Sequence, residues 1–317
     1  MTNPLVTIIV PVYKAENYIA RCAKSLLEQT YDNVEYFFVN DCTPDNSVEV
    51  LVETIKEYPE REKDVNIINF DSNKGHAYAR NVALKKASGK YVIQIDADDW
   101  VERDLLEVMV PIAEANNSDI TCCSFYWESE TQTYCKVYSE NVGKEGLMNF
   151  KILLENSAHW NKLIKLSLIR DNNIYCLEGT NNWVDVGQVI PLRFMANKVS
   201  STDKALYHYN VGNINSVSRK LTPKRIDDML RVTDYVTSFV ENRSNGEYSL
   251  SMNYLKFYAK WALIAGSNSS YKSWREKYPE SNKYLFKYPF PTSRKILFLC
   301  ALFHMSFVYE LAKRFSA

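Results

Sequence analysis

Three carboxylates follow one apolar run, and they are the clearest candidates for chemistry in the chain. Tyr91–Ile95 has the β-branched composition of a buried strand, and Asp96, Asp98 and Asp99 come directly after it. Ligands of open α/β sheets bind at the carboxyl ends of strands. Carboxylate oxygens in that place suit Mg²⁺ or Mn²⁺ holding a phosphorylated substrate. The competing interpretation is an acidic turn that caps the next helix.

The elements that would position these acids come before them in regular alternation. Strands are expected at Val6–Val10, Glu35–Val39 and Val65–Phe70. Helices are expected between them at Glu16–Gln29 and at about His76–Ala87. A further helix is expected to bury the stripe formed by Val48, Leu51, Val52 and Ile55. Four strands alternating with three helices predict βαβ units and a mostly parallel sheet.

Each of the four strands ends in polar residues. These are Tyr13 with Lys14, Asn40 with Asp41, Asn73 with Lys74, and Asp96 with Asp98. All carboxyl ends of a parallel sheet lie on one edge, so these side chains are expected to converge. Core packing does not require such convergence, and it therefore indicates a ligand site more strongly than any single motif.

Composition limits the class of protein. The 317 residues include 38 Lys+Arg and 38 Asp+Glu, and a zero formal charge gives no support to a nucleic-acid-binding function. The seven cysteines are odd in number and lack metal-knuckle spacing, which favours reduced thiols in a cytoplasmic protein. We expect neither a signal peptide nor a transmembrane span. No Gly-rich phosphate loop of the Walker or dinucleotide type is present.

The rest of the chain predicts a change of architecture near Ser216–Thr222. Before that boundary, a helix is expected to carry Leu105, Leu106, Met109 and Ile112. Two antiparallel strands are expected next, at Asp119–Trp127 and Thr131–Tyr138. Helices are expected at Glu145–Leu154, Leu166–Asn172 and Val186–Ala196, and Pro191 would kink or start the last of them. A strand follows at Val199–Tyr209. After it the pattern is helical at Arg225–Glu241, Leu250–Ala265, Tyr271–Tyr278 and Ser293–Phe315. We therefore expect a catalytic domain at 1–218 and a helical region at 219–317.

Four motifs in order resemble one known family. They are the run Val6–Tyr13, the turn Asn40–Asp45, the stretch Asn73–Asn81 and the stretch Asp96–Trp100. Together they resemble the nucleotide-sugar domain of the family-2 glycosyltransferases over roughly residues 5–215. The resemblance implies the GT-A fold, an α/β architecture with a Rossmann-like, mostly parallel sheet, here followed by a C-terminal helical extension.

The resemblance also implies roles for individual residues at the strand ends. Pro11 and Tyr13 match the lining of the nucleotide pocket, and Asp41 matches the acid that accepts a hydrogen bond from the pyrimidine base. The remaining matches are Asn73 at the base or ribose, Arg80 near the base and diphosphate, Asp96 near the ribose, and Asp98 as the metal ligand of the Asp-X-Asp motif. Cys42 stands where relatives usually have a glycine.

The acceptor half of the site is expected from three places later in the chain. Asp185 matches the general base, although Val184 replaces the Glu that usually precedes it; a helix cap is the alternative. His208 matches a residue near the metal or diphosphate, and a structural histidine is the alternative. Trp160, Asn161 and Lys162 resemble an acceptor-side motif, with core packing as the alternative for Trp160. Asn215 and Ser216 resemble a late polar loop that closes over the diphosphate.

The tail holds an apolar segment with basic flanks. Arg294 and Lys295 precede Ile296–Phe303, and Lys313 and Arg314 follow. Such a helix fits a membrane surface or a subunit contact, or packs on its own domain.

Taken together, the residues and the resemblance predict an inverting, metal-dependent hexosyltransferase. It would use Mn²⁺ or Mg²⁺ and a nucleotide-sugar donor, most simply a UDP-sugar, with GDP- and dTDP-sugars left open. The acceptor would be a glycan or a lipid-linked saccharide in bacterial surface-polysaccharide synthesis, at the inner face of the cell membrane, with no nucleic acid and with a homo-oligomer left open. The alternatives are a catalytically weak binding module, favoured by Val184, and a nucleotidyltransferase, disfavoured by the missing phosphate loop.

Overall fold

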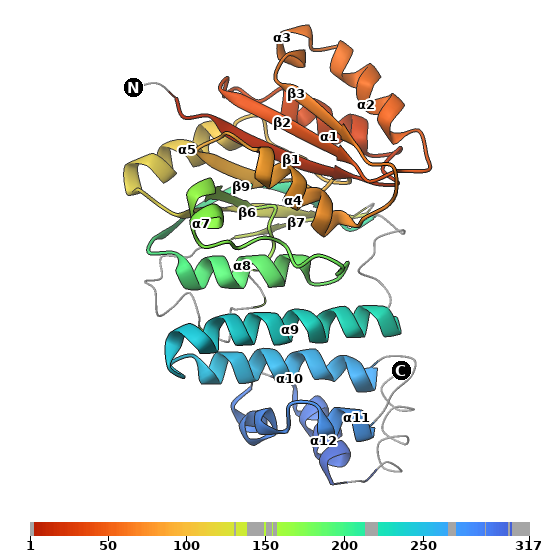
Figure 1. Cartoon of the computed structure of the whole chain (residues 1–317), viewed down its shortest axis with the longest axis vertical. Coiled ribbons are helices and arrows are strands. Elements are labelled where there is room, and N and C mark those ends of the chain that lie inside the picture. Colours follow the sequence, from red (N-terminus) through yellow and green to blue (C-terminus); the bar gives the residue numbers. More distant parts are fainter. Residues whose placement is uncertain are drawn as a thin grey trace. The chain divides into compact units, whose positions relative to one another are not determined.

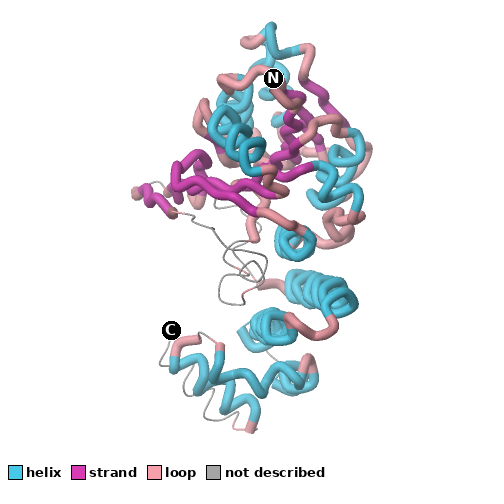
Figure 2. Tube along the Cα trace, turned by 90° about the vertical axis from the view of Figure 1, so that its left-hand side faces the viewer, coloured by secondary structure: helices cyan, strands magenta, loops and turns pink. Residues whose placement is uncertain are grey.

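The fold is taken from a computed structural model, which describes residues 3–129, 131–137, 149, 154, 157–212, 221–265, 271–288, 290–303 and 305. The chain divides into two compact units (Figure 1). The first comprises residues 1–147 and 157–216, and the second comprises residues 148–156 and 217–317. The second unit thus includes a short stretch from the middle of the chain, which the expected boundary at 218/219 did not anticipate. Figure 2 shows strands in the first unit and only helices in the second.

The described strands of the first unit form one mixed sheet in the order β3-β2-β1-β4-β8-β6-β9-β5, with β7 paired to β6. The strands are β1 (Val6–Val12), β2 (Val34–Asn40), β3 (Val65–Asn69), β4 (Tyr91–Gln94), β5 (Trp100–Val101), β6 (Ile120–Glu128), β7 (Thr133–Lys136), β8 (Lys162–Lys165) and β9 (Val199–Asn210). As predicted, β1 to β4 are mutually parallel. β6 and β7 are antiparallel, also as predicted.

Helices cover both faces of this sheet. They are α1 (Ile19–Leu27), α2 (Ser47–Lys56), α3 (Pro59–Glu62), α4 (His76–Lys86), α5 (Leu105–Asn116), α7 (Leu166–Asp171) and α8 (Val184–Met195). On one face, alternate β1 residues such as Ile8 and Val10 pack with α1, α2 and α5 in the main core. On the other face α4 lies against β1 and β2 (Figure 1).

Two helical predictions differ from the structure in detail. In the predicted apolar stripe of α2, Leu51 and Ile55 are buried, whereas Val48 and Val52 are only half-buried. The helix α8 begins at Val184 and continues through Pro191, which neither starts nor ends it. The expected helix at 145–154 lies almost wholly outside the described residues.

The second unit is a helical assembly. Its elements are α9 (Pro223–Ser244), α10 (Ser249–Ala265), α11 (Tyr271–Glu276), the 3-10 helix Pro279–Lys287 and α12 (Thr292–Leu302). α9 and α10 lie side by side (Figure 1). An aromatic core fills this unit around Phe257, Trp274, Tyr288 and Phe298. Positions 306–317, which complete the predicted last helix, are not among the described residues.

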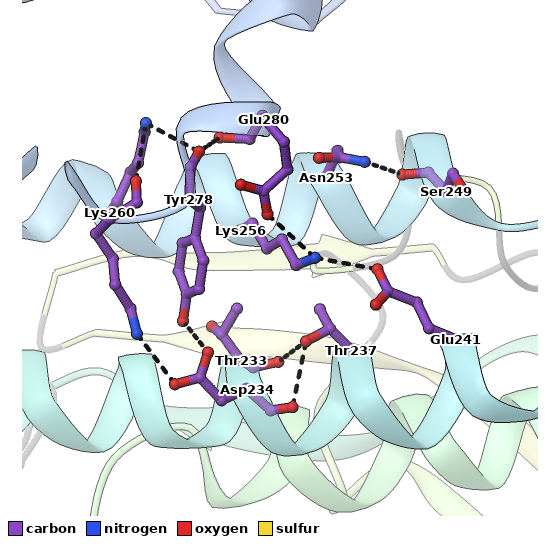
Figure 3. Close-up of polar contacts among 12 residues, drawn as sticks. Thr233, Asp234, Thr237, Glu241, Ser249, Asn253, Lys256, Lys260, Tyr278 and Glu280 are labelled. Carbon is purple, nitrogen blue, oxygen red and sulfur yellow. Dashed lines mark hydrogen bonds and ion pairs between the residues drawn. The ribbon is translucent and has the colours of Figure 1, made fainter. Parts of the chain in front are cut away.

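A buried lysine joins the helices of this unit (Figure 3). The Lys260 ammonium donates to the carbonyl oxygens of Lys277 (3.2 Å) and Tyr278 (3.4 Å) and to Asn282 Oδ1 (2.5 Å). The Tyr278 hydroxyl donates in turn to Asp234 Oδ1 on α9 at 2.6 Å. Since Lys260 is fully buried, burial lowers its pKa to about 7. No helix in the described part of the chain has the length and hydrophobicity needed to cross a membrane.

Candidate active site

The sheet brings the predicted strand-end residues to one edge. β1 and β2 are in register up to Val12 and Asn40, and the next amide, that of Asp41, donates to the Val12 carbonyl oxygen at 3.0 Å. Asn73, which follows β3, donates from Nδ2 to the Asp41 carbonyl oxygen at 3.2 Å. Tyr13 follows β1 directly, and 43% of its surface is exposed. These contacts leave a half-open polar edge, with the Tyr13 ring available to a ligand.

Asp41 holds the loop after β3 in place. Its two carboxylate oxygens accept from the backbone N–H groups of Lys74 (2.6 Å) and Gly75 (2.8 Å), and only 2% of the residue is exposed. Gly75 has φ +88°, and a Cβ there would come within 2.5 Å of Asn181 Oδ1, so this turn requires glycine. Asp41 is therefore a positioning residue, and each of its oxygens keeps a further lone pair for a ligand.

The buried Arg80 and the half-buried Asp96 form an ion pair beside this loop. The Arg80 guanidinium donates through Nη2 to Asp96 Oδ1 and through Nη1 to His76 Nδ1 at 2.7 Å. Burial, and then the Arg80 charge, lowers the pKa of His76 to about 4. The neutral ring then donates from Nε2 to the Asn181 carbonyl oxygen at 3.3 Å. This chain of contacts ties α4 to the loop that precedes α8.

Asp96, Asp98 and Asp99 have different environments. Asp99 is 1% exposed and accepts from the Tyr207 hydroxyl and from the Asn210 N–H (2.7 Å), which fixes the end of β9. Asp98 stays half-exposed. Burial raises the pKa of Asp99 well above its ordinary value, and the charges of Asp98 and Asp96 raise it further. The three acids therefore share one region of excess negative charge.

A divalent cation fits this set of oxygen donors. No group of three His, Cys, Asp or Glu residues forms a ready-made cage within the described ranges. Mg²⁺ and similar cations commonly bind through one or two carboxylates together with substrate phosphates, rather than in an all-protein cage. Asp98 is half-buried beside these acids, and it stays the residue that is predicted to hold the cation.

His208, predicted near the metal or the diphosphate, has both ring nitrogens close to carboxylates. Its Nδ1 faces Glu128 Oε1 at 2.8 Å and its Nε2 faces Glu102 Oε1 at 3.0 Å. The ring is stacked between Trp100 and Tyr126, with centroids 4.9 and 4.7 Å away. Both nitrogens are thus paired with carboxylates, which favours the structural alternative, and the metal role of His208 stays a prediction.

Asp185 lies in the first turn of α8. Trp183 caps this helix in the left-handed conformation (φ 60°), and Asp185 Oδ1 accepts from the Val186 N–H at 2.9 Å. Burial raises the pKa of Asp185, Asp96 raises it further, and Arg80 lowers it. Val184, which replaces the usual Glu, packs with Ala77 and Cys176 in a small apolar cluster. The departure from the family motif thus serves packing and leaves Asp185 in the site.

Tyr209 lies close enough to four acids for their charges to affect the pKa of its hydroxyl group. Burial, and then the charges of Asp99, Asp96, Asp98 and Asp185 in that order, raise the pKa of Tyr209 to about 12. The acids come from the end of β4 and from α8, far apart in sequence. Their charges therefore reach one phenol from two elements that are distant in the sequence.

A buried pair of glutamines links the two acidic elements. Gln94 on β4 donates from Nε2 to Gln188 Oε1 on α8 at 3.0 Å. Gln188 Oε1 also accepts from Cys176 Sγ at 3.4 Å, and its Nε2 donates to the Ile174 carbonyl oxygen at 3.2 Å. Gln94 lies two residues before Asp96. No sequence signal pointed to this pair, because a glutamine inside an apolar strand reveals nothing about its distant partner.

The expected acceptor motif is mostly buried. Asn161 and Lys162 are 2% and 1% exposed, and the Lys162 ammonium donates to Asn161 Oδ1 at 2.8 Å. Their burial opposes direct contact with an acceptor, and the resemblance to an acceptor-side motif stays a prediction. Trp160 is half-buried and stacks on Tyr207 and Tyr209, with centroids 4.5 and 5.3 Å away. Positions 215 and 216, expected in a closing loop, lie outside the described residues.

Comparison with known proteins agrees with this arrangement. The sequence profile of Glycosyl transferase family 2 matches residues 7–176. EpsH of Bacillus subtilis, named as a glycosyltransferase, is 30% identical over 265 residues, which are 78% of this chain and 73% of EpsH. A second relative is the Staphylococcus aureus poly(ribitol-phosphate) β-N-acetylglucosaminyltransferase TarS. The two sequences are 25% identical over an alignment that covers 64% of this chain and 35% of TarS.

A solved structure shares the fold. The crystal structure of S. aureus TarS 1-349 in complex with UDP superposes with a TM-score of 0.66 and 22% identity. The match covers 89% of this chain and 78% of the TarS chain. At this identity the likeness establishes the GT-A architecture, which confirms the predicted fold class.

Proposed function

Because the chain belongs to glycosyl transferase family 2, it is a glycosyltransferase, and we propose that it is an inverting enzyme dependent on Mg²⁺ or Mn²⁺ that uses a UDP-sugar donor. The observation that carries this proposal is the hydrogen bond from Gln94 to Gln188 at 3.0 Å, because it joins β4, which is followed by Asp96 and Asp98, to α8, which carries Asp185. The family includes relatives named for surface-polymer synthesis, and we propose a glycan or lipid-linked acceptor of that kind.

The donor would lie along the carboxyl edge of β1 to β4. The exposed Tyr13 ring and Pro11 offer a surface for the base, and Asp41 retains lone pairs that could accept from a uracil N–H. Arg80 and Asp96, joined as an ion pair, and Asn73 complete the polar edge for ribose and diphosphate. Asp98 would hold the cation. A cation held there would neutralise the diphosphate and so help it to depart as the leaving group.

The chemical step needs one base. Asp185 takes the proton of the acceptor hydroxyl as that oxygen forms a bond to the anomeric carbon of the donor sugar. The bond from this carbon to the diphosphate oxygen breaks with its electron pair going to the nucleotide. A single displacement of this kind inverts the anomeric configuration. Burial raises the pKa of Asp185, which makes its carboxylate a stronger base than a solvated aspartate.

A membrane-surface location is part of the proposal. Ile296, Phe303 and Met305 in and beside α12 are exposed apolar side chains, and they support contact with the inner face of the cell membrane. Flotation with liposomes tests it: the chain truncated before Ser293 should stay behind while the full chain floats. Equal partitioning of the two would refute it.

Donor hydrolysis tests the proposed activity directly. The chain is incubated with Mn²⁺ and a panel of UDP-, GDP- and dTDP-sugars, with Asp98→Ala as the inactive variant. We expect slow hydrolysis of one UDP-sugar that the variant lacks. Hydrolysis of a GDP- or dTDP-sugar alone would refute the UDP assignment, and hydrolysis that survives Asp98→Ala would refute the role of Asp98.

A further inference from the structure

An aromatic face runs along β6, β7 and β9. Trp127 on β6 is paired with Tyr134 on β7 and with Tyr209 on β9. Residues that face each other across paired strands have side chains on the same side of a sheet. Trp127 is 43% exposed and Tyr134 is 59% exposed, whereas Tyr209 is half-buried. Two large rings thus lie side by side at the surface, and a third connects them to the interior.

This face is continuous with the candidate active site. The Trp127 ring meets Tyr209 edge-on with centroids 5.2 Å apart, and Tyr209 stacks on Trp160 at 5.3 Å. Trp160 stacks on Tyr207, whose hydroxyl donates to Asp99. The ladder of rings therefore leads from the surface to the acids at the end of β4. Tyr209 also experiences the charge of Asp185.

On the opposite face of β6 and β9 the aromatic rings have partners. Its rings and acids are already paired with one another, because His208 lies between Trp100 and Tyr126 and bonds Glu102 and Glu128. Packing thus accounts for the aromatic residues on that face. It does not account for the exposure of Trp127 and Tyr134, which leave their apolar ring surfaces in water.

We propose that Trp127 and Tyr134 form an outer acceptor subsite that stacks on a pyranose ring of a saccharide acceptor. The C–H groups on one side of a pyranose form a flat apolar surface of the size of an aromatic ring, while its hydroxyls stay hydrated at the rim. A chain held there reaches along the ladder toward Asp185. This inference rests on the proposed function, because the ligand is the acceptor of that reaction.

The size of the surface favours a sugar over a protein partner. Two exposed rings provide far less than the roughly 1,000 Å² that a stable protein interface buries. They are enough for one or two sugar units, since an aromatic contact contributes about 0.5–1.5 kcal/mol beyond its area, a factor of about 2 to 12 in affinity. Trp127 and Tyr134 would thus select acceptors that present an unsubstituted pyranose face.

Binding by calorimetry tests this subsite on the full chain in the presence of UDP and Mn²⁺. The probes are cellotriose, maltotriose and chitotriose, with a glycerol phosphate trimer as the ligand that lacks a pyranose. We expect at least one trisaccharide to bind, Trp127→Ala to weaken it about tenfold and Tyr134→Ala about threefold. Trp127→Phe should recover most of the affinity. Phe286→Ala, which removes a ring that is 71% exposed in the second unit, is the matched control and should change nothing.

Three outcomes would overturn the inference. They are the absence of binding by all three trisaccharides, equal binding by the Trp127→Ala variant, and self-association in sedimentation that Trp127→Ala abolishes, which would make this face a contact between copies. UDP-sugar hydrolysis by the unaltered chain reports on the proposed function separately. Hydrolysis without trisaccharide binding refutes only the subsite, and the absence of hydrolysis refutes the function beneath it.

Discussion

Replacing Gln188 should disturb both the stability of the first unit and the placement of Asp185. Gln188→Leu leaves the Gln94 Nε2 group and the Ile174 carbonyl buried without their present partners. An unsatisfied buried polar group costs about 1–3 kcal/mol, so the variant should lose about 2–5 kcal/mol. Gln188 is one turn from Asp185 on α8, and small displacements of a reacting group can lower kcat by about a hundredfold.

Gln94→Leu should cost much less than Gln188→Leu. The Gln94 Oε1 atom is buried and already lacks a hydrogen-bond partner. Removing Gln94 therefore removes an existing penalty, while Gln188 Oε1 keeps its bond from Cys176 Sγ. We expect a loss of at most about 1 kcal/mol. The double variant should be more stable than the sum of the two single losses predicts, by about 1–3 kcal/mol.

Hydrogen exchange of β4 and α8 amides measures these stabilities in the first unit alone, which avoids treating a two-unit chain as a single transition. UDP affinity and kcat, measured on the same variants, separate donor binding from placement of the base. Gln188→Leu should keep the UDP affinity and lower kcat. Equal losses in the two single variants, or strict additivity in the double variant, would refute the reasoning.

Three further changes have expected outcomes. Asp185 must be ionised to act as a base, so activity should fall as the pH drops through its raised pKa. Asp96→Asn removes a charge that raises this pKa, so the acid limb of the kcat/KM profile should move to lower pH, although the variant is less active overall. An acid limb that does not move would exclude Asp185 as the titrating base. Lys260 has a pKa of about 7 when folded and 10.5 when unfolded, so the unfolded chain binds more protons between these values. The free energy of unfolding of the second unit should rise from pH 7 to pH 9 by up to about 1.4 kcal/mol per pH unit. Urea titrations measure this rise, and the Lys260→Met variant should not show it. Cys42 has φ 54°, so Cys42→Gly should raise the unfolding free energy by about 1 kcal/mol while Cys42→Ala does not; a gain in both would point away from backbone strain.

The sequence predicted the parallel part of the sheet, β1 to β4, because patterns that are local in the sequence specify these strands. The β-branched run of β4 and the polar residues after each parallel strand specify both the strands and the edge where they converge. The first four strands accordingly agree with their predicted ranges to within about two residues. The GT-A architecture followed from motifs in this same part of the chain.

The surroundings that the sequence did not predict depend on contacts that are distant in sequence. His208 has the type of a metal ligand, but Glu102 and Glu128 come from two other segments and occupy both of its nitrogens. Asp98 and Asp99 are adjacent and alike in sequence, and only the position of β9 decides that Asp99 is buried against Tyr207. Partners of this kind are set by the tertiary fold, and a single sequence carries no periodic signal for them.

UDP binding, measured by calorimetry in the presence of Mn²⁺, tests most directly whether Asp98 holds the cation and Asp185 acts as the base. Asp98→Asn and Asp185→Asn each remove one charge with little change in size. The account predicts that Asp98→Asn loses the Mn²⁺-dependent part of the UDP affinity, while Asp185→Asn binds UDP as the unaltered chain does and fails to transfer sugar. Unchanged Mn²⁺-dependent UDP binding by Asp98→Asn would contradict it.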